Sequence, residues 1–425
     1  MGSATESAVV EVPILHLQSQ SKQTSLLASS DETYWRKVTM ETMRQMLEFA
    51  RYTPVARERC MSLHEQLVCP NMGPAPDPKA AAKGCLTSDG TPIEYSLSFG
   101  GADEAPVVRY SIDPDGTSQL AAYATRNAQT IESAVQGTSG VDMGWYRTIK
   151  ASMRLETNES AFGSLVKAAG HTSQIMFGFD FERDGEINAK AYFLPCLAAA
   201  ERKHTRWQVV REAVEQVVAV TGSSMASVVP QLSMLQEHLR SYGDAIEDSV
   251  RYLATDLVQP EKARLKIYIR CPGQEFEQVW GFLTMRGKIA YSEEHRLAIK
   301  TLYEATVLLG QARSQDGVGD VVAQTNAFQK QSICYYVLKK DASVPSSKLF
   351  IRMDRKTAVS DIKIAQTLQR WLSRSDGGAG YEDFLGSAFC NQDMDGDVTA
   401  HAWLAVSVKK GKLTLESYLA PHLFA

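Results

Sequence analysis

The sequence lacks the features of a membrane-embedded, secreted or nucleic-acid-binding protein. No segment is apolar over the roughly 20 residues that a membrane helix needs. The first thirty residues contain no basic start followed by a long apolar run, so we expect no secretory signal. The formal net charge of the 425 residues is -4, which gives no overall attraction to nucleic acid or to an anionic membrane. These absences favour a cytoplasmic protein.

Patterns of metal-binding residues are also scarce. The seven cysteines are scattered, and no two have the short spacing of a zinc site or a redox motif. The nearest acidic cluster, Asp393, Asp395 and Asp397, has a calcium-like spacing. However, it lacks the later Glu of an EF-hand loop, and a predicted strand follows it. We interpret this cluster as a solvated turn and expect neither a metal nor another cofactor.

What the chain does contain is an alternation of strand pairs with amphipathic helices. Residues 1–30 are rich in Ser, Thr and Gln and are interpreted as a flexible arm, and residues 31–425 as a single domain. Ten strands are predicted, at 92–99, 107–112, 173–181, 190–194, 264–271, 278–284, 333–338, 348–353, 400–408 and 412–419. Helices are predicted at about 31–57, 146–169, 204–220, 232–257, 292–310 and 358–372.

Repeated helix–hairpin–helix units predict an α+β fold in which a ten-stranded antiparallel sheet closes into a barrel surrounded by helices. Two open sheets in an ordinary α+β protein are the alternative.

Cations and aromatic rings share one face of several predicted strands. Alternate residues of a strand point the same way, so a cation two residues before a ring lies on the same face as that ring. This order occurs on three strands, at Lys190 and Tyr192, at Lys266 and Tyr268, and at Lys348 and Phe350. Polar faces of antiparallel sheets commonly meet water. A barrel with apolar faces turned outward, under a coat of helices, would instead place these residues in its interior.

An interior lined by cations and aromatic rings suits one kind of chemistry. Clustered Arg and Lys neutralise a diphosphate and stabilise it as a leaving group. Aromatic faces stabilise a neighbouring carbocation and exclude water. An allylic diphosphate that ionises needs both. A non-catalytic carrier of a small hydrophobic ligand is the alternative of another class.

Six segments resemble the dimethylallyltryptophan-synthase-like aromatic prenyltransferases, the fungal indole prenyltransferase family. They lie at 90–96, 108–114, 190–195, 263–270, 348–351 and around Tyr418, and together they span about residues 34 to 421. Each segment alone is weakly diagnostic, but their order and spacing are specific. The resemblance implies the prenyltransferase barrel and a metal-independent enzyme of secondary metabolism. Such an enzyme moves a dimethylallyl or geranyl group from its diphosphate to an electron-rich aromatic ring by Friedel–Crafts alkylation.

The same resemblance implies roles for individual residues. Glu94 would be the catalytic residue that accepts a hydrogen bond from the acceptor. The other implied residues are Arg109, Lys190, Arg264, Lys266 and Lys348 for diphosphate binding, Tyr192, Tyr268, Phe350 and Tyr418 around the allylic cation, and Leu86 and Met176 in the acceptor pocket. The expected partners are small-molecule substrates alone, with no nucleic acid and no membrane. Monomer and homodimer both remain open.

Two positions depart from the family pattern. Phe350 stands where family members usually have tyrosine, so one ring lacks its hydroxyl. Met176 stands where the tryptophan carbon-4 enzymes have a lysine base, and methionine cannot take a proton. Prenylation of free tryptophan at carbon 4 is therefore disfavoured. We expect an indole- or tryptophan-derived acceptor with dimethylallyl diphosphate, and a phenolic or polycyclic polyketide with geranyl diphosphate is the alternative.

Overall fold

Ten antiparallel strands close into a barrel in the computed structural model. It describes residues 29–76, 84–100, 105–114, 121–138, 140–156, 159–311, 332–353, 361–372, 380–389, 400–409 and 411–423. The strand order is β1-β10-β9-β8-β7-β6-β5-β4-β3-β2, so each strand pairs with its neighbours in the chain and β10 returns to β1. This confirms the predicted barrel and excludes two open sheets. Most of the predicted N-terminal arm, and the cluster of Asp393, Asp395 and Asp397, lie outside the described residues.

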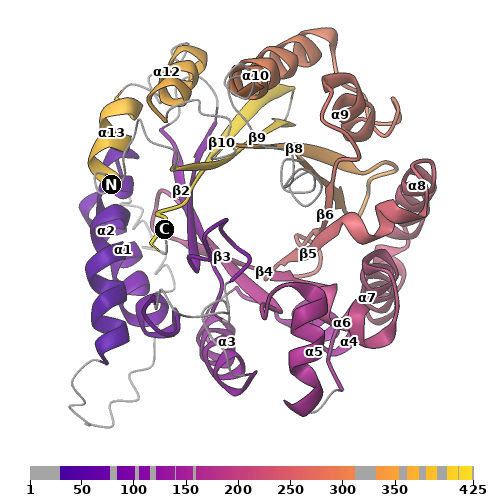
Figure 1. Cartoon of the computed structure of the whole chain (residues 1–425), viewed down its shortest axis with the longest axis horizontal. Helices are drawn as coiled ribbons and strands as arrows, with labels where there is room; N and C mark the ends of the chain where they lie inside the picture. The colour runs from indigo at the N-terminus through magenta and orange to yellow at the C-terminus, as the bar shows by residue number, and fades with distance from the viewer. Residues whose placement is uncertain are drawn as a thin grey trace, which may run out of the picture.

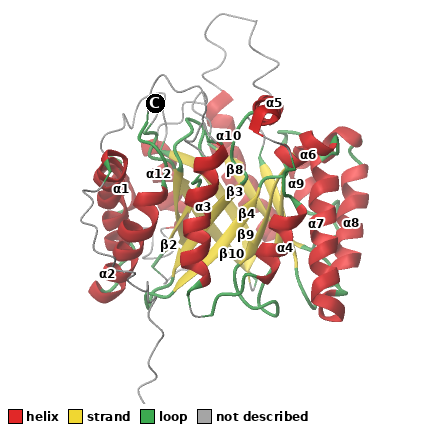
Figure 2. Cartoon of the chain, turned by 90° about the horizontal axis from the view of Figure 1, so that it is seen from below, coloured by secondary structure: helices red, strands yellow, loops and turns green. Residues whose placement is uncertain are grey.

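The helices form a ring around the strands (Figure 1). In the side view, α3, α4, α7 and α8 stand along the outside of the barrel (Figure 2). The strands are β1 Ile93–Phe99, β2 Val107–Ile112, β3 Ile175–Phe181, β4 Ile187–Phe193, β5 Val250–Asp256, β6 Leu265–Arg270, β7 Ile333–Leu338, β8 Ser346–Arg352, β9 His401–Lys409 and β10 Lys412–Leu419. The α-helices are α1 Ser30–Phe49, α2 Pro54–Leu63, α3 Ala121–Gln136, α4 Gly144–Ser152, α5 Glu159–Ala169, α6 Cys196–Arg202, α7 Arg206–Thr221, α8 Val228–Arg240, α9 Phe276–Leu283, α10 Glu293–Gln311, α12 Asp361–Leu372 and α13 Tyr381–Ala388. No helix in the described ranges combines the length and the apolar character needed to cross a bilayer.

The main hydrophobic core lies between the barrel and this ring of helices. On β6, Leu265, Ile267 and Ile269 are fully buried in that layer, and helix residues such as Trp207 belong to the same cluster. Burial of each such side chain contributes about 1.5 to 3 kcal/mol. Because strand residues alternate, outward apolar faces leave the opposite faces to line the barrel interior.

Two predictions assigned the wrong type of secondary structure. The predicted strand at 278–284 belongs to helix α9, in which Phe276, Val279 and Leu283 are buried at a spacing of three to four residues. The predicted helix at 232–257 ends at Arg240, and its last part is strand β5. Gly243, with φ of 86°, marks the break, because only glycine adopts this conformation readily. The number of strands is still ten, because the unpredicted strand β5 replaces the wrongly predicted strand at 278–284.

A third prediction, one helix over 146–169, is also corrected. The structure has two helices there, α4 and α5. Likewise, the helix predicted at about 31–57 is divided into α1 and α2, with Pro54 as the first residue of α2. Proline is favoured at a helix start because its missing N–H has no partner there in any case.

Candidate functional site

Two adjoining cavities occupy the barrel interior. The first, here called the cationic cavity, is lined by Ser96, Arg109, Tyr110, Ser111, Gly178, Asp180, Lys190, Tyr192, Arg264, Lys266, Tyr268, Tyr335, Lys348, Lys409, Glu416 and Tyr418. The second, here called the aromatic cavity, is lined by Leu86, Glu94, Ser111, Met176, Tyr192, Tyr252, Tyr268, Ile333, Phe350, Trp403 and Tyr418. Four residues line both, so the cavities meet at Ser111, Tyr192, Tyr268 and Tyr418.

The direction of the strands explains this separation of charge from rings. Alternate strands of an antiparallel barrel run the same way, so β4, β6 and β8 are parallel to one another. In each of them a cation precedes an aromatic ring by two residues on the inward face. The three cations therefore lie nearer one end of the barrel, and the three rings lie one layer further along.

Glu416 on β10 is the centre of one group of charges in the cationic cavity. Its carboxylate oxygen Oε1 lies 2.9 Å from Arg109 Nη1 and 3.8 Å from Lys409 Nζ, and Oε2 pairs with Lys348. Arg109 Nε also lies 3.5 Å from Asp180 Oδ1. Glu416 is 2% exposed. Its burial opposes ionisation, but Lys348 and Arg109 outweigh this and hold the pKa of Glu416 well below its usual range.

Two further carboxylates hold the remaining cations. Asp180 on β3 pairs with Lys190. Asp256 on β5 accepts from Arg264 Nε at 2.7 Å and from Lys266 Nζ at 2.6 Å. Six cations against three carboxylates leave a formal charge of +3 among the described residues of this cavity. An anionic ligand is the natural complement to this excess.

Burial lowers the pKa of three lysines in the cationic cavity, Lys266, Lys348 and Lys409. Burial, together with neighbouring cations, lowers the pKa of Lys266 to about 7 and that of Lys409 to about 8. The pKa of Lys348 is also lowered by burial, although Glu416 opposes the shift. An arriving anion would raise these pKa values again, because it favours the charged form of each lysine.

Glu94 on β1 is the acidic group of the aromatic cavity. Its side chain is 7% exposed, and its oxygen Oε1 has no hydrogen-bond partner among the described residues. Burial raises the pKa of Glu94 to about 8, although the guanidinium of Arg352 acts in the opposite direction. A hydrogen-bond donor on a bound ligand would satisfy this oxygen.

Aromatic rings form a continuous wall where the two cavities meet. The ring of Tyr268 lies 6.0 Å from that of Tyr192 and 5.7 Å from that of Phe350, and Phe350 lies 5.4 Å from Tyr418, centroid to centroid. Lys348 Nζ lies 5.7 Å from the centre of the Phe350 ring, and the Tyr335 ring stands 4.9 Å from Tyr268. A group held at this junction faces ring surfaces and little water.

The structure places every predicted site residue in one of the two cavities. The five predicted cations, Arg109, Lys190, Arg264, Lys266 and Lys348, all line the cationic cavity. Glu94, Leu86, Met176 and Phe350 line the aromatic cavity, and Tyr192, Tyr268 and Tyr418 line both.

Sequence reasoning missed several members of the site. Lys409 is the last residue of β9, where charges are usually solvated, and Glu416 lies in the middle of β10; they share the inward faces of these strands with Trp403 and Tyr418, respectively. Tyr252 and Asp256 lie on β5, which was predicted as helix, so their shared face was hidden. The other lining residues outside the predicted site are Ser96, Tyr110, Ser111, Gly178, Asp180, Ile333, Tyr335 and Trp403.

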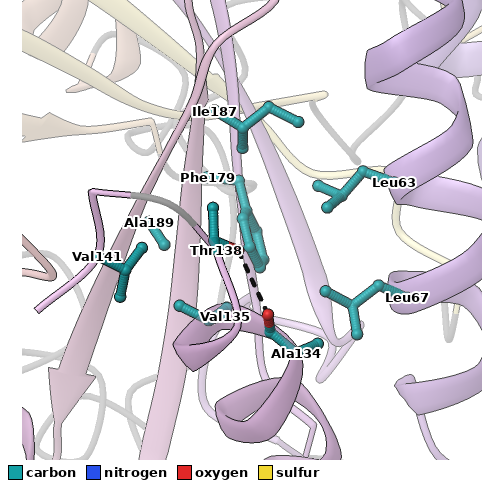
Figure 3. Close-up of a pocket in the computed structure, with 9 residues that line it drawn as sticks. All are labelled: Leu63, Leu67, Ala134, Val135, Thr138, Val141, Phe179, Ile187 and Ala189. Atoms are coloured by element: carbon teal, nitrogen blue, oxygen red, sulfur yellow. Dashed lines mark hydrogen bonds between the residues drawn. The ribbon is translucent and has the colours of Figure 1, made fainter. Parts of the chain in front are cut away.

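A further pocket lies outside the barrel wall, between α3 on one side and Leu63 and Leu67 on the other (Figure 3). It is lined by aliphatic and aromatic side chains apart from Thr138, whose hydroxyl donates to the carbonyl of Ala134 at 3.3 Å. With no charged or free polar group to orient a ligand, it is a gap in packing rather than a reactive site. Within the described ranges, no group of three or more His, Cys, Asp or Glu side chains is arranged to hold a metal ion.

Comparisons with known proteins agree with this geometry. A family model described as tryptophan dimethylallyltransferase matches residues 31–385. Prenyltransferase phnF of Penicillium herquei is 26% identical over 448 aligned residues, covering 100% of this chain and 99% of the relative. DMATS-type prenyltransferase mfmD of Annulohypoxylon moriforme is 28% identical and covers 98% of this chain and 99% of its own.

The fold is also similar to solved structures. The crystal structure of NotF prenyltransferase has a TM-score of 0.77 at 19% identity, covering 96% of this chain and 98% of NotF. A second NotF structure, in complex with brevianamide F and DMSPP, has a TM-score of 0.75 at 18% identity over the same shares of both chains.

Proposed function

The chain belongs to the tryptophan dimethylallyltransferase family and is an aromatic prenyltransferase, and we propose that it joins a prenyl group from an allylic diphosphate to an electron-rich aromatic ring without a metal. One observation carries this proposal: a cavity with an excess of three positive charges opens, through a wall of aromatic rings, into an apolar cavity that contains one buried carboxyl group. The arrangement suits a diphosphate, an allylic cation and an aromatic acceptor in that order along the barrel.

The cationic cavity would bind the diphosphate through Arg109, Lys190, Arg264, Lys266 and Lys348. An alkyl diphosphate carries up to three negative charges, which match the excess of positive charge. As the bond between the allylic carbon and oxygen breaks, its electron pair leaves with the diphosphate. The lysine and arginine donors stabilise that developing charge, a task that Mg²⁺ performs in metal-dependent enzymes.

The ring wall would stabilise the allylic cation. The faces of Tyr192, Tyr268, Phe350 and Tyr418 present electron density at the junction of the cavities. They also keep water away, because a water molecule that reached the cation would convert it into a prenyl alcohol. Phe350 fulfils this role without a hydroxyl.

Glu94 would orient the acceptor. An indole N–H or a phenol O–H that donates to Glu94 satisfies its orphan oxygen and turns the ring toward the cation. The positive charge that develops on the ring during attack favours the ionised carboxylate. The attacking ring carbon forms the new carbon–carbon bond, and its proton then passes to the released diphosphate, which restores aromaticity.

The acceptor is proposed from the lining of the aromatic cavity. An indole- or tryptophan-derived ring with a dimethylallyl donor is our first candidate, and Leu86 and Met176 would form its apolar wall. A phenolic or polycyclic polyketide with a geranyl donor is the second. Met176 favours it, because a methionine in place of a base suits a ring that needs no strong base to lose its proton.

Donor binding in the presence of EDTA tests this function. We expect dimethylallyl thiolodiphosphate, at about 100 times its dissociation constant, to stabilise the protein by about 2.7 kcal/mol. For 425 residues this corresponds to a rise of about 3 °C in Tm. Lys266→Met should abolish the shift, whereas Lys288→Met, which alters an exposed lysine paired with Glu237, should leave it intact. A shift that needs Mg²⁺, or that Lys266→Met leaves unchanged, would contradict the proposal.

A further inference from the structure

Glu416 differs from the other two carboxylates of the cationic cavity in the groups that donate to it. Within the part of the chain that the structure describes, Asp180 and Asp256 accept side-chain hydrogen bonds from lysine and arginine alone. Glu416 also accepts one from a ring of the aromatic wall, because the Tyr418 hydroxyl donates to its oxygen Oε2 at 2.9 Å. This carboxylate therefore connects the charges of one cavity to the rings at the junction with the other.

Donors from several strands fix the position of the Glu416 carboxylate. Its oxygen Oε1 accepts from Arg109 Nη1 at 2.9 Å and from the Ser98 hydroxyl at 3.4 Å, while Oε2 pairs with Lys348. These donors come from β2, β1 and β8, and Tyr418 lies on β10 itself. A buried carboxylate that accepts several charge-assisted hydrogen bonds is held in one orientation and stays ionised. Glu416 is thus a rigid hydrogen-bond acceptor for the Tyr418 hydroxyl.

Donor binding alone does not explain a carboxylate in this position. Its charge has the same sign as that of a diphosphate, so it weakens the attraction of the cavity for the donor. It does help to keep the buried Lys348 protonated in the empty cavity. A bound diphosphate takes over that task, because it brings negative charge of its own. The hydrogen bond from Tyr418, in contrast, can serve the reaction after the donor has bound.

The Tyr418 ring lies where the proposed reaction places the allylic cation. It lines both cavities, and its centre lies 5.4 Å from that of the Phe350 ring, with 52° between the ring planes. Glu416 and Tyr418 are two residues apart on β10, so both side chains point inward. Burial, together with the charge of Glu416, raises the pKa of Tyr418 well above its usual range. The hydroxyl therefore keeps its hydrogen and remains a donor.

We infer that Glu416 is a positioning residue for prenyl transfer: by holding the Tyr418 hydroxyl, it keeps the face of that ring toward the allylic cation. The inference rests on the proposed function, since it concerns the cation formed in that reaction. A Tyr418 hydroxyl without this partner would donate to the diphosphate, whose oxygens are strong acceptors. The ring would turn with its hydroxyl and shield the cation less well. Water would then capture a larger share of the cation as prenyl alcohol.

The share of donor that is lost to prenyl alcohol tests this role. Dimethylallyl diphosphate is incubated in EDTA with a tryptophan diketopiperazine, with indole or with 1-naphthol, and the acceptor that gives most product with the wild-type protein is kept. Water enriched in oxygen-18 labels the alcohol formed from the cation, whereas alcohol released by a contaminating phosphatase stays unlabelled. Mass spectrometry gives the ratio of labelled alcohol to prenylated product, after subtraction of the enzyme-free reaction. Calorimetry gives the affinity for dimethylallyl thiolodiphosphate.

Glu416→Gln should improve donor binding and impair transfer. We expect the alcohol ratio to rise at least about threefold and kcat to fall about tenfold, the scale of one hydrogen bond to a charged group. The variant should nevertheless bind the thiolodiphosphate more tightly, because the cavity loses a negative charge. A site that is only damaged would lose donor affinity as well. Asp256→Asn is the matched control, because it removes a negative charge from the same cavity but Asp256 holds no tyrosine hydroxyl. Its alcohol ratio should equal that of the wild type.

Two further variants test the contact itself. Tyr418→Phe keeps the ring and removes the hydroxyl, so Glu416→Gln in this background should no longer change the alcohol ratio. Glu416→Asp keeps the charge but withdraws the carboxylate by one methylene group. The long side chains of Lys348 and Arg109 can follow it, whereas the Tyr418 hydroxyl cannot. This variant should raise the alcohol ratio with donor affinity within about twofold of the wild type, and it serves in place of Glu416→Gln if that protein does not fold.

The outcomes separate the role of Glu416 from the proposed function. If product forms but neither Glu416 variant changes the alcohol ratio, or if the ratio rises equally in the Tyr418→Phe background, the inference is wrong and the function stands. An equal rise in Asp256→Asn also overturns the inference, since the charge of the cavity would then be the cause. If the wild-type protein forms no product with any of the three acceptors, the proposed function itself fails.

Discussion

Replacing Glu94 by glutamine should make the protein more stable, increasingly so as the pH rises. The carboxyl is buried and its pKa is raised from 4.5 to about 8, so the folded state holds a proton that the unfolded state releases. Stability therefore falls as the pH rises from about 4.5 to about 8 and changes little above that. A shift of about 3.5 units corresponds to about 5 kcal/mol at high pH and about 3 kcal/mol at pH 7.

Glutamine has nearly the same shape and does not ionise, so the variant escapes this loss. For a chain of 425 residues, about 4 kcal/mol corresponds to about 4 °C in Tm. We would record the Tm of both proteins by differential scanning fluorimetry from pH 4.5 to pH 9. The difference in Tm between the variant and the wild type should grow by about 4 °C from pH 4.5 to pH 9. Parallel curves would show that Glu94 ionises normally and is not held in an apolar environment.

The same variant separates stability from activity. If Glu94 orients the acceptor, Glu94→Gln should lower product formation by at least about 100-fold while affinity for the thiolodiphosphate stays within about twofold, because Glu94 lies in the other cavity. Full activity in the variant would remove Glu94 from the mechanism.

Three further results are expected. Between pH 7 and 9 the dissociation constant of the thiolodiphosphate, measured by calorimetry, should rise at least about tenfold. Lys266 and Lys409 have pKa values of about 7 and 8, so both lose their charge over this range. A dissociation constant that does not change with pH would contradict these low pKa values. Glu416→Gln leaves the buried Lys348 without its carboxylate and removes one of the two carboxylates beside Arg109, so Tm should fall by about 3 to 5 °C. In a thermal-shift assay, pyrophosphate should raise the Tm of the variant by more than it raises that of the wild type. Equal pyrophosphate shifts in both proteins would contradict the balance of charges around Glu416. Phe350→Ala removes a cation–π contact of about 2 kcal/mol, so the rate of product formation should fall about 30-fold. Chromatography should show a larger share of prenyl alcohol, and the control variant Phe350→Tyr should behave like the wild type. An unchanged rate in the alanine variant would show that the Phe350 ring does not stabilise the allylic cation.

The inward faces of the strands were predictable because they depend on alternation alone. Lys266 and Tyr268 share a face at any register, and the buried Leu265 and Ile267 on the other face fix which side meets the helices. Recurrence of the same order on β4 and β8 then identified the barrel interior before any pairing was known.

The missed residues could not be identified from the alternation of side chains between the two faces of a strand. Asp256 follows an amphipathic stretch that fits a helix, but the positive φ of Gly243 and a 3₁₀ turn at Asp244–Ser249 separate that helix from the strand. Glu416 was overlooked because its role comes from Arg109 and Lys348, which are distant in sequence and meet it only when the barrel closes.

The pKa of Glu94 likewise emerges from tertiary structure. Its sequence neighbours Ile93 and Tyr95 point into the outer core, and the apolar surroundings that raise the pKa come from other strands, through Met176, Phe350 and Trp403. Sequence indicates that a carboxyl group faces the interior, whereas its protonation state depends on what the closed barrel places around it.

Metal-independent prenyl transfer is tested most directly by an EDTA-treated incubation analysed by mass spectrometry. Dimethylallyl and geranyl diphosphate would each be crossed with a tryptophan diketopiperazine, indole-3-propionate and a polyhydroxylated naphthacene. We expect at least one pair to give a product heavier than the acceptor by one prenyl unit, with release of an equal amount of diphosphate. No product in any pair, together with no release of diphosphate, would contradict metal-independent prenyl transfer and favour a barrel that only carries a hydrophobic ligand.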